Sequence, residues 1–160
     1  MSQPKTIHRL DYRPPDYRIE TVRLRFELDE EATRVWSCLE LIRLSPQPCP
    51  LVLDGAELEL LELRLDGEPV AAGRYRVDER GLTLDDPPQR FRLETVTRIR
   101  PQDNTSLEGL FKSSGSFCTQ CEAEGFRKIT YYLDRPDVMA RFATTLVADP
   151  ERYPVLLSNG

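Results

Sequence analysis

The residues best suited to chemistry lie in one short segment, Cys118–Arg127, which holds two cysteines, a glutamine and two glutamates. Cys118 and Cys121 have the spacing of half a structural zinc site, which usually needs two such pairs. The other cysteines, Cys38 and Cys49, lie within or beside expected strands. A redox pair would need a strand–helix–strand setting that lowers a thiol pKa, and the sequence offers none. Metal or redox chemistry at this pair is therefore poorly supported.

A second interpretation of the same segment is structural. Polar side chains in loops more often cap turns and satisfy backbone groups than form binding sites. On composition alone, this interpretation is favoured over the metal or redox one.

The chain contains a single histidine, His8. A His-Glu-x-x-His zinc motif needs two histidines on one helical face. A serine or cysteine nucleophile needs a histidine held beside it. His8 lies instead in a polar, proline-flanked segment near the N-terminus. We therefore expect neither a catalytic residue nor a metal ligand in this chain.

Composition argues against two classes of partner. The 22 basic and 27 acidic residues give a net charge of −5 and are interleaved along the chain, whereas a nucleic-acid-binding domain carries a basic excess or stripe. No apolar run approaches the roughly 20 residues of a membrane helix, and the first residues lack the apolar segment of a signal peptide. We expect a cytoplasmic protein with free thiols, and neither a nucleic acid nor a membrane as partner.

The first hundred residues, which must help to position the segment, predict β-strands. Residues 17–29 and 91–99 alternate between apolar and charged side chains, as half-buried strands do. Residues 33–44 carry apolar side chains on both faces, which favours a central place in a sheet. Further strands are expected at residues 51–53, 70–77 and 81–84.

Residues 57–66 are ambiguous. Leu58 and Leu60 share one phase of the strand pattern, and the leucines from Leu61 onward share the other, which indicates a strand with a β-bulge. Leucines at 58, 61 and 65 also fit a helix. The strand is favoured because Asp66-Gly67 follows as a hairpin turn.

Residues 101–128 are rich in serine, glycine and asparagine and predict a long loop, which in compact domains is usually functional. Strands are expected again at residues 129–133, 141–148 and 154–157. Asn159-Gly160 is a hairpin turn signal with no strand after it, so we expect the chain to be a fragment of a longer protein.

The predicted organisation is an extended leader, residues 1–16, followed by a single β domain, residues 17–160. The close spacing of short strands and turns indicates an all-β fold, a curved and mostly antiparallel sheet or sandwich. No strand–helix alternation appears, which argues against a parallel α/β fold.

Thr119-Gln120-Cys121-Glu122-Ala123-Glu124-Gly125-Phe126-Arg127 resembles the Gln-x-Glu loop of the aminopeptidase N family in its bacterial form. The resemblance covers almost the whole chain. The other matching segments are Asp11–Tyr17, Asn104–Leu110, Ile129–Phe142 and Tyr153–Gly160.

This resemblance implies the N-terminal, saddle-like β domain of a zinc aminopeptidase, an enzyme that releases N-terminal amino acids from peptides. It implies that Glu122 binds the α-ammonium group of the substrate and that Gln120 lines the site. The implied partners are peptide N-termini and a thermolysin-like catalytic domain of the same chain. That domain, expected after residue 160, would hold zinc, and this chain would hold no metal and be inactive alone. Glu124 receives no role beyond a structural or solvated one.

A carboxylate suits the role implied for Glu122, because it binds an ammonium group through short, charge-assisted hydrogen bonds. A loop held by a rigid sheet would fix the distance from that amine to the scissile bond. Two alternatives remain open. One is a free-standing, non-catalytic β-sandwich that binds peptide N-termini or another protein. The other is a small zinc or thiol protein centred on Cys118 and Cys121.

Overall fold

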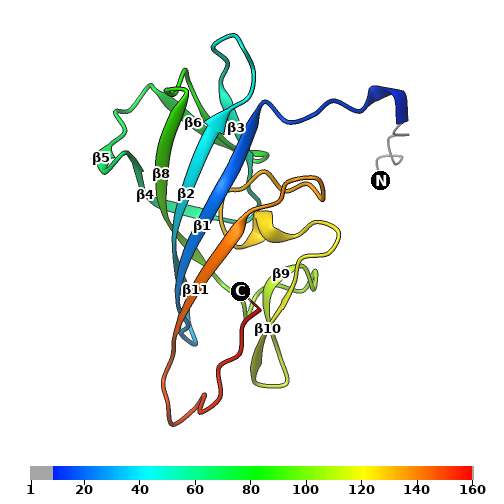
Figure 1. Cartoon of the computed structure of the whole chain (residues 1–160). Coiled ribbons are helices and arrows are strands. Elements are labelled where there is room, and N and C mark those ends of the chain that lie inside the picture. The colour runs from blue at the N-terminus through cyan, green and yellow to red at the C-terminus, as the bar shows by residue number, and fades with distance from the viewer. Residues whose placement is uncertain (1–8, 160) are drawn as a thin grey trace.

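The computed structural model describes residues 9–159, which form three groups of strands (Figure 1). A six-stranded sheet has the order β11-β1-β2-β8-β4-β5, a three-stranded sheet has the order β3-β7-β6, and β9 and β10 form a separate hairpin. The strands are β1 (Tyr17–Glu27), β2 (Thr33–Arg43), β3 (Leu51–Asp54), β4 (Glu59–Leu65), β5 (Glu68–Pro69), β6 (Tyr75–Asp78), β7 (Gly81–Leu84), β8 (Arg90–Ile99), β9 (Gly109–Ser113), β10 (Ser116–Gln120) and β11 (Arg141–Val147). Two 3-10 turns are also present, η1 (Arg9–Asp11) and η2 (Phe126–Lys128).

The long strands of the large sheet form where the sequence alternates. In β1 the side chains of Val22, Leu24 and Phe26 are buried, whereas the arginines between them face solvent. β2 lies between β1 and β8, as its two apolar faces indicated. Every strand pair in the described residues is antiparallel except β1 and β11, which run parallel. The prediction of an all-β, mostly antiparallel fold is confirmed.

The ambiguous segment 57–66 is a strand with an irregularity. β4 pairs with β8, and the register shifts between Leu60 and Glu62. The shift lets leucines of both phases contact the core. The predicted β-bulge is confirmed, and the helical alternative is wrong.

The prediction of an unbroken loop over residues 101–128 is wrong, because β9 and β10 form a hairpin within it. Ser114 and Gly115 connect the two strands with φ angles of 49° and 86°. Positive φ at both central residues is the signature of a tight type I′ turn, and the Ser-Gly pair was the signal for it.

Two strand predictions were also wrong: residues 154–157 form no strand, and within 70–77 the strand begins only at Tyr75.

The strand predicted at residues 129–133 is likewise absent. The segment is buried, but the N–H groups of Ile129 and Thr130 donate to the carbonyl of Phe126 and join no ladder. Its single bridge pairs Tyr132 with Asp54 at the end of β3. On its other side it packs on β8, where the Thr97 hydroxyl donates to the Ile129 carbonyl at 3.3 Å. The segment therefore joins the large sheet to the small one.

The leader predicted at residues 1–16 lies partly outside the described residues, and His8 lies wholly outside them. Within the described part, the Tyr12 hydroxyl donates to the Asp137 carboxylate at 3.0 Å, and the Arg135 guanidinium donates to the Arg13 carbonyl at 2.9 Å. The boundary between leader and domain stays a prediction. Nowhere in residues 9–159 is there a helix long and apolar enough to cross a membrane.

Gly55 provides a test of the packing between the two sheets. A Cβ atom added to Gly55 would lie 2.4 Å from Cε1 of Tyr131, a side chain that is 2% exposed. Because Tyr131 cannot move aside without displacing the core, Gly55→Ala should lower the free energy of unfolding by about 1–3 kcal/mol. Urea denaturation measures this change.

Ala72→Ser, at an exposed position in the turn before β6, is the control and should stay within about 0.5 kcal/mol. An unchanged stability for Gly55→Ala would show that Tyr131 has room that the structure does not give it.

Candidate functional site

The loop that the sequence singled out connects β10 to η2. It begins after Gln120, the last residue of β10, and leads to Phe126. Gln120 and Glu122 are both exposed, and the Glu122 N–H donates to the Gln120 side-chain oxygen at 3.4 Å. The peptide bond between Glu122 and Ala123 is cis. The structure thus brings the two predicted site residues together at the surface.

Glu124, two residues further on, has a different environment. Its carboxylate forms an ion pair with the Arg127 guanidinium, three residues along the chain. Arg127 also contacts Asp134, and these two carboxylates raise the pKa of Arg127 despite the opposing effect of its partial burial. Glu124 is therefore engaged within the protein, which agrees with a structural role.

Asp134 is the residue at this site that sequence reasoning missed. It is 6% exposed, and its Oδ2 atom accepts hydrogen bonds from the Gly125 N–H at 2.9 Å and the Arg127 N–H at 3.2 Å. The same oxygen accepts from Arg127 Nε at 2.6 Å. An aspartate directly after an apolar run looks like a turn residue in sequence, so only the fold reveals these contacts.

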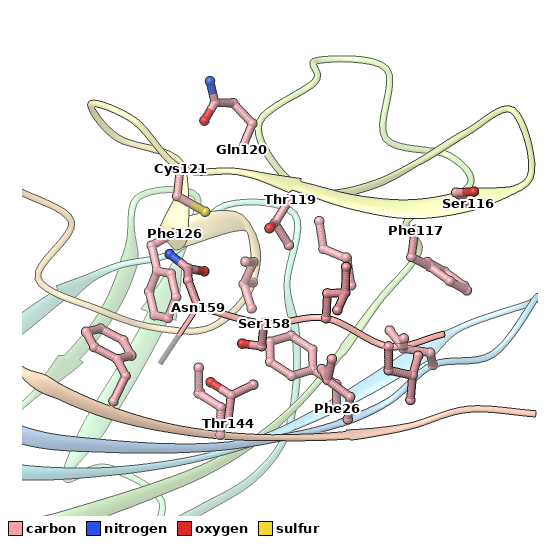
Figure 2. Close-up of a pocket in the computed structure, with 18 of the residues that line it drawn as sticks. Phe26, Ser116, Phe117, Thr119, Gln120, Cys121, Phe126, Thr144, Ser158 and Asn159 are labelled. Atoms are coloured by element: carbon pink, nitrogen blue, oxygen red, sulfur yellow. The ribbon is translucent and has the colours of Figure 1, made fainter. Parts of the chain in front are cut away.

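A cavity of about 600 Å³ lies beside the loop, between the β9–β10 hairpin and strands β1 and β11 (Figure 2). Phe26, Phe126 and Phe142 give it an apolar lining, and Gln120 and Glu122 contribute to its wall. Figure 2 shows the Gln120 amide pointing away from the space that the phenylalanines line. The lining is thus mixed, because polar side chains such as Thr119, Thr144 and Asn159 line the same cavity as the phenylalanines.

A polar cluster lies beside the same cavity, which Phe117 and Tyr153 help to line. Glu30, in the β1–β2 turn, accepts hydrogen bonds from Lys112 of β9 and from the Tyr153 hydroxyl. The hydrogen bond from Lys112 is the main reason that the pKa of Glu30 is lowered. The Phe117 and Tyr153 rings pack at 5.1 Å between centroids. The cluster fixes both the hairpin and the segment after β11, and no sequence pattern pointed to it.

The described residues do not fit a zinc site. Between residues 9 and 159 no three histidine, cysteine, aspartate or glutamate side chains gather closely enough to hold a metal ion. Figure 2 shows the Cys121 sulfur pointing into the cavity. Burial, assisted by the negative charge of Asp134, raises the pKa of the Cys121 thiol to about 11. This is the opposite of what a redox or metal-binding thiol needs, so we assign no metal or thiol chemistry to Cys121.

Comparison with known proteins identifies the family to which this chain belongs. Residues 62–160 match the Peptidase M1 N-terminal domain family. Over 158 residues, 99% of this chain, the sequence is 47% identical to aminopeptidase N of Escherichia coli (strain K12). It is 48% identical over 157 residues to aminopeptidase N of Caulobacter vibrioides. The crystal structure of Legionella pneumophila aminopeptidase A in complex with aspartic acid superposes with a TM-score of 0.88, at 31% identity over 94% of this chain.

The chain therefore belongs to the Peptidase M1 N-terminal domain family, and the resemblance drawn from its sequence is confirmed. It spans 18% of the length of each of these three proteins. The activity of those full-length proteins is therefore only proposed for this chain.

The Cys121 thiol provides a test of the site as described. Because its pKa is raised to about 11, the thiolate is scarce at neutral pH, and alkylation by iodoacetamide at pH 8 should be slow. In a variant with the other three cysteines changed to serine, the rate should climb steadily as pH rises toward 11. The rate is followed by mass spectrometry.

The matched control is the same variant in urea, where alkylation at pH 8 should be fast. Equal rates for the folded and unfolded chain at pH 8 would contradict the burial of Cys121.

Proposed function

We propose that this chain is the first domain of a cytoplasmic zinc aminopeptidase and that it provides the group that binds the substrate's α-ammonium. The observation that carries the proposal is the difference between Glu122 and Glu124. Glu122 is exposed beside Gln120, whereas Glu124 is already paired with Arg127. The aminopeptidases matched at 47% and 48% identity support the proposed activity.

The chemistry required of such a group is simple. An exopeptidase must recognise a positive charge at a fixed distance from the bond that it cleaves. A carboxylate does so through short, charge-assisted hydrogen bonds, and the Gln120 amide can orient the same amine. Since Glu122 sits on a loop fixed at both ends, its distance from a neighbouring domain is constant.

Bond cleavage is assigned to a thermolysin-like catalytic domain of the same protein, which would hold the zinc. Residues 1–160 alone should accordingly bind the amine end of a peptide without cleaving it.

Substitution of Glu122 in the full-length protein tests the proposal. Removing one partner of a shielded, hydrogen-bonded charge pair costs about 2–5 kcal/mol. Glu122→Ala should therefore lower kcat/KM on an aminoacyl chromogenic amide by roughly 30-fold to several thousand-fold. Glu122→Gln keeps the size but loses the charge, and it should be nearly as damaging.

Glu124→Ala is the control, since it removes a carboxylate two residues away that contacts Arg127. It should reduce stability rather than kcat/KM. A folded Glu122→Ala enzyme with near-parental kcat/KM would exclude Glu122 as the amine-binding group. It would favour the alternative of a non-catalytic binding domain.

We also propose that the catalytic domain covers the apolar surface beside the cavity. Val155 and Leu157 are 71% and 86% exposed, and both line the cavity together with Phe142 of β11. Apolar groups gathered in this way usually mark an interface. A domain seated on this surface would also lie beside Glu122, which lines the same cavity.

The isolated chain should accordingly self-associate through this surface. Val155→Ser/Leu157→Ser should shift the chain toward monomer in sedimentation velocity. Val52→Ser, at an exposed valine of β3, is the matched control and should change nothing. A parent chain that is strictly monomeric at millimolar concentration would count against this surface as an interface.

A further inference from the structure

The loop that carries Glu122 has little regular structure of its own. Residues 121–125 belong to no strand or helix, and Glu122, Ala123 and Glu124 are exposed. Exposed loops that form no strand hydrogen bonds are usually mobile. A carboxylate that binds an amine at a fixed distance from the scissile bond must nevertheless be held in one position. Something outside the loop must therefore fix it.

The two ends of the loop are in direct contact. Gly125 has φ of 140°, and a Cβ atom added to it would lie 2.9 Å from the Gln120 carbonyl oxygen and 3.3 Å from the Cys121 Cα. A glycine is required at such a close approach of backbones. Fixing Gly125 thus fixes the base of the loop from which Glu122 projects.

Asp134 is the group that holds Gly125. One oxygen of its buried carboxylate accepts from the Gly125 N–H at 2.9 Å, the Arg127 N–H at 3.2 Å and Arg127 Nε at 2.6 Å. The charge of Arg127 compensates the buried carboxylate. Hydrogen bonds to an ionised acceptor are about twice as strong as neutral ones. A single oxygen atom therefore holds both Gly125 and Arg127, just after the exposed part of the loop.

Asp134 is in turn fixed to the three-stranded sheet. Its N–H donates to Asp54 Oδ2 at 3.0 Å, and Asp54, the last residue of β3, exchanges backbone hydrogen bonds with Tyr132 at 2.7 and 3.1 Å. A continuous set of contacts therefore runs from β3 through Asp54 and Asp134 to Gly125.

We infer that Asp134 is a positioning residue that sets the place of the Glu122 carboxylate relative to the substrate amine. The inference rests on the proposed function of Glu122. Asp134 is buried and touches no substrate, so it acts only through the loop. Without its negative charge, the backbone N–H groups of Gly125 and Arg127 lose an ionised acceptor and keep at most a weaker, neutral one. The Arg127 guanidinium also loses its buried counter-charge, and the base of the loop is loosened.

The test is a double-mutant cycle in the full-length protein, with kcat and KM measured on an aminoacyl chromogenic amide. Asp134→Asn alone should lower kcat/KM by about 10-fold to 100-fold, the scale of a misplacement of about 1 Å. The loss should appear mainly as a raised KM, because amine binding is lost in the ground and transition states alike. In the Glu122→Ala background, Asp134→Asn should change kcat/KM by less than about threefold, because the group that it positions is already gone.

Asp137→Asn is the matched control. Asp137 is three residues away, exposed, and bound to Arg135 and Tyr12, and its substitution should leave kcat and KM unchanged in both backgrounds. Thermal melts show whether each variant is folded at the assay temperature. If Asp134→Asn is not folded, Asp54→Ala, which removes the acceptor for the Asp134 N–H, takes its place in the cycle and should show a smaller loss that also disappears in the Glu122→Ala background.

The outcomes separate the two claims. If Glu122→Ala lowers kcat/KM but the Asp134 or Asp54 variant has the same effect in both backgrounds, or none, the positioning role is overturned and the proposed function stands. If Glu122→Ala has no effect, the proposed function fails, and the positioning role fails with it.

Discussion

The arrangement of this domain depends on the burial of an irregular segment, Ile129–Asp134, between two sheets. Backbone groups removed from water must find hydrogen-bond partners, and a segment without a ladder must find them one by one. The Phe126 carbonyl accepts from the first N–H groups of the segment, and the Thr97 hydroxyl donates to the Ile129 carbonyl. The backbone N–H and carbonyl of Asp54 bind those of Tyr132. These contacts connect the six-stranded sheet to the three-stranded sheet through one short stretch of chain.

The same requirement explains why a carboxylate lies inside the protein. A buried charge is tolerated only when it is paired and hydrogen-bonded, and Asp134 meets both conditions by binding Arg127 and the Gly125 N–H. In doing so it transfers the rigidity of the sheets to an exposed loop. In the proposed function, stability and recognition are connected at this point, because the carboxylate that pairs with Arg127 in the interior also binds Gly125 at the base of the loop that carries Glu122.

Much of the fold was predictable because it follows from side-chain alternation. β1, β2 and β8 are long, half-buried strands, and even the bulge in β4 appeared as a change of phase among leucines. One strand prediction failed where burial is complete. Residues 129–133 are apolar like a strand, but they are enclosed on both sides and join no ladder.

The site was predictable only in part. The segment around Gln120 and Glu122 stood out by its residue types and its resemblance to a known loop, and the structure places these two residues together. Asp134, Glu30 and Tyr153 could not be recognised, because their partners lie elsewhere along the chain: Asp134 reaches back to Gly125, and Glu30 meets Tyr153 across 123 residues. Such contacts depend on topology, which no local pattern records.

We propose that a loop fixed to a rigid β domain presents the Glu122 carboxylate to the amino group of a peptide. A crystal structure of the full-length protein with a bound peptide or amino acid tests this most directly. The ligand's ammonium nitrogen should lie about 2.7–2.9 Å from a Glu122 oxygen, and Gly125 should still be held by Asp134. An ammonium group bound by other side chains, with Glu122 turned toward solvent, would contradict it.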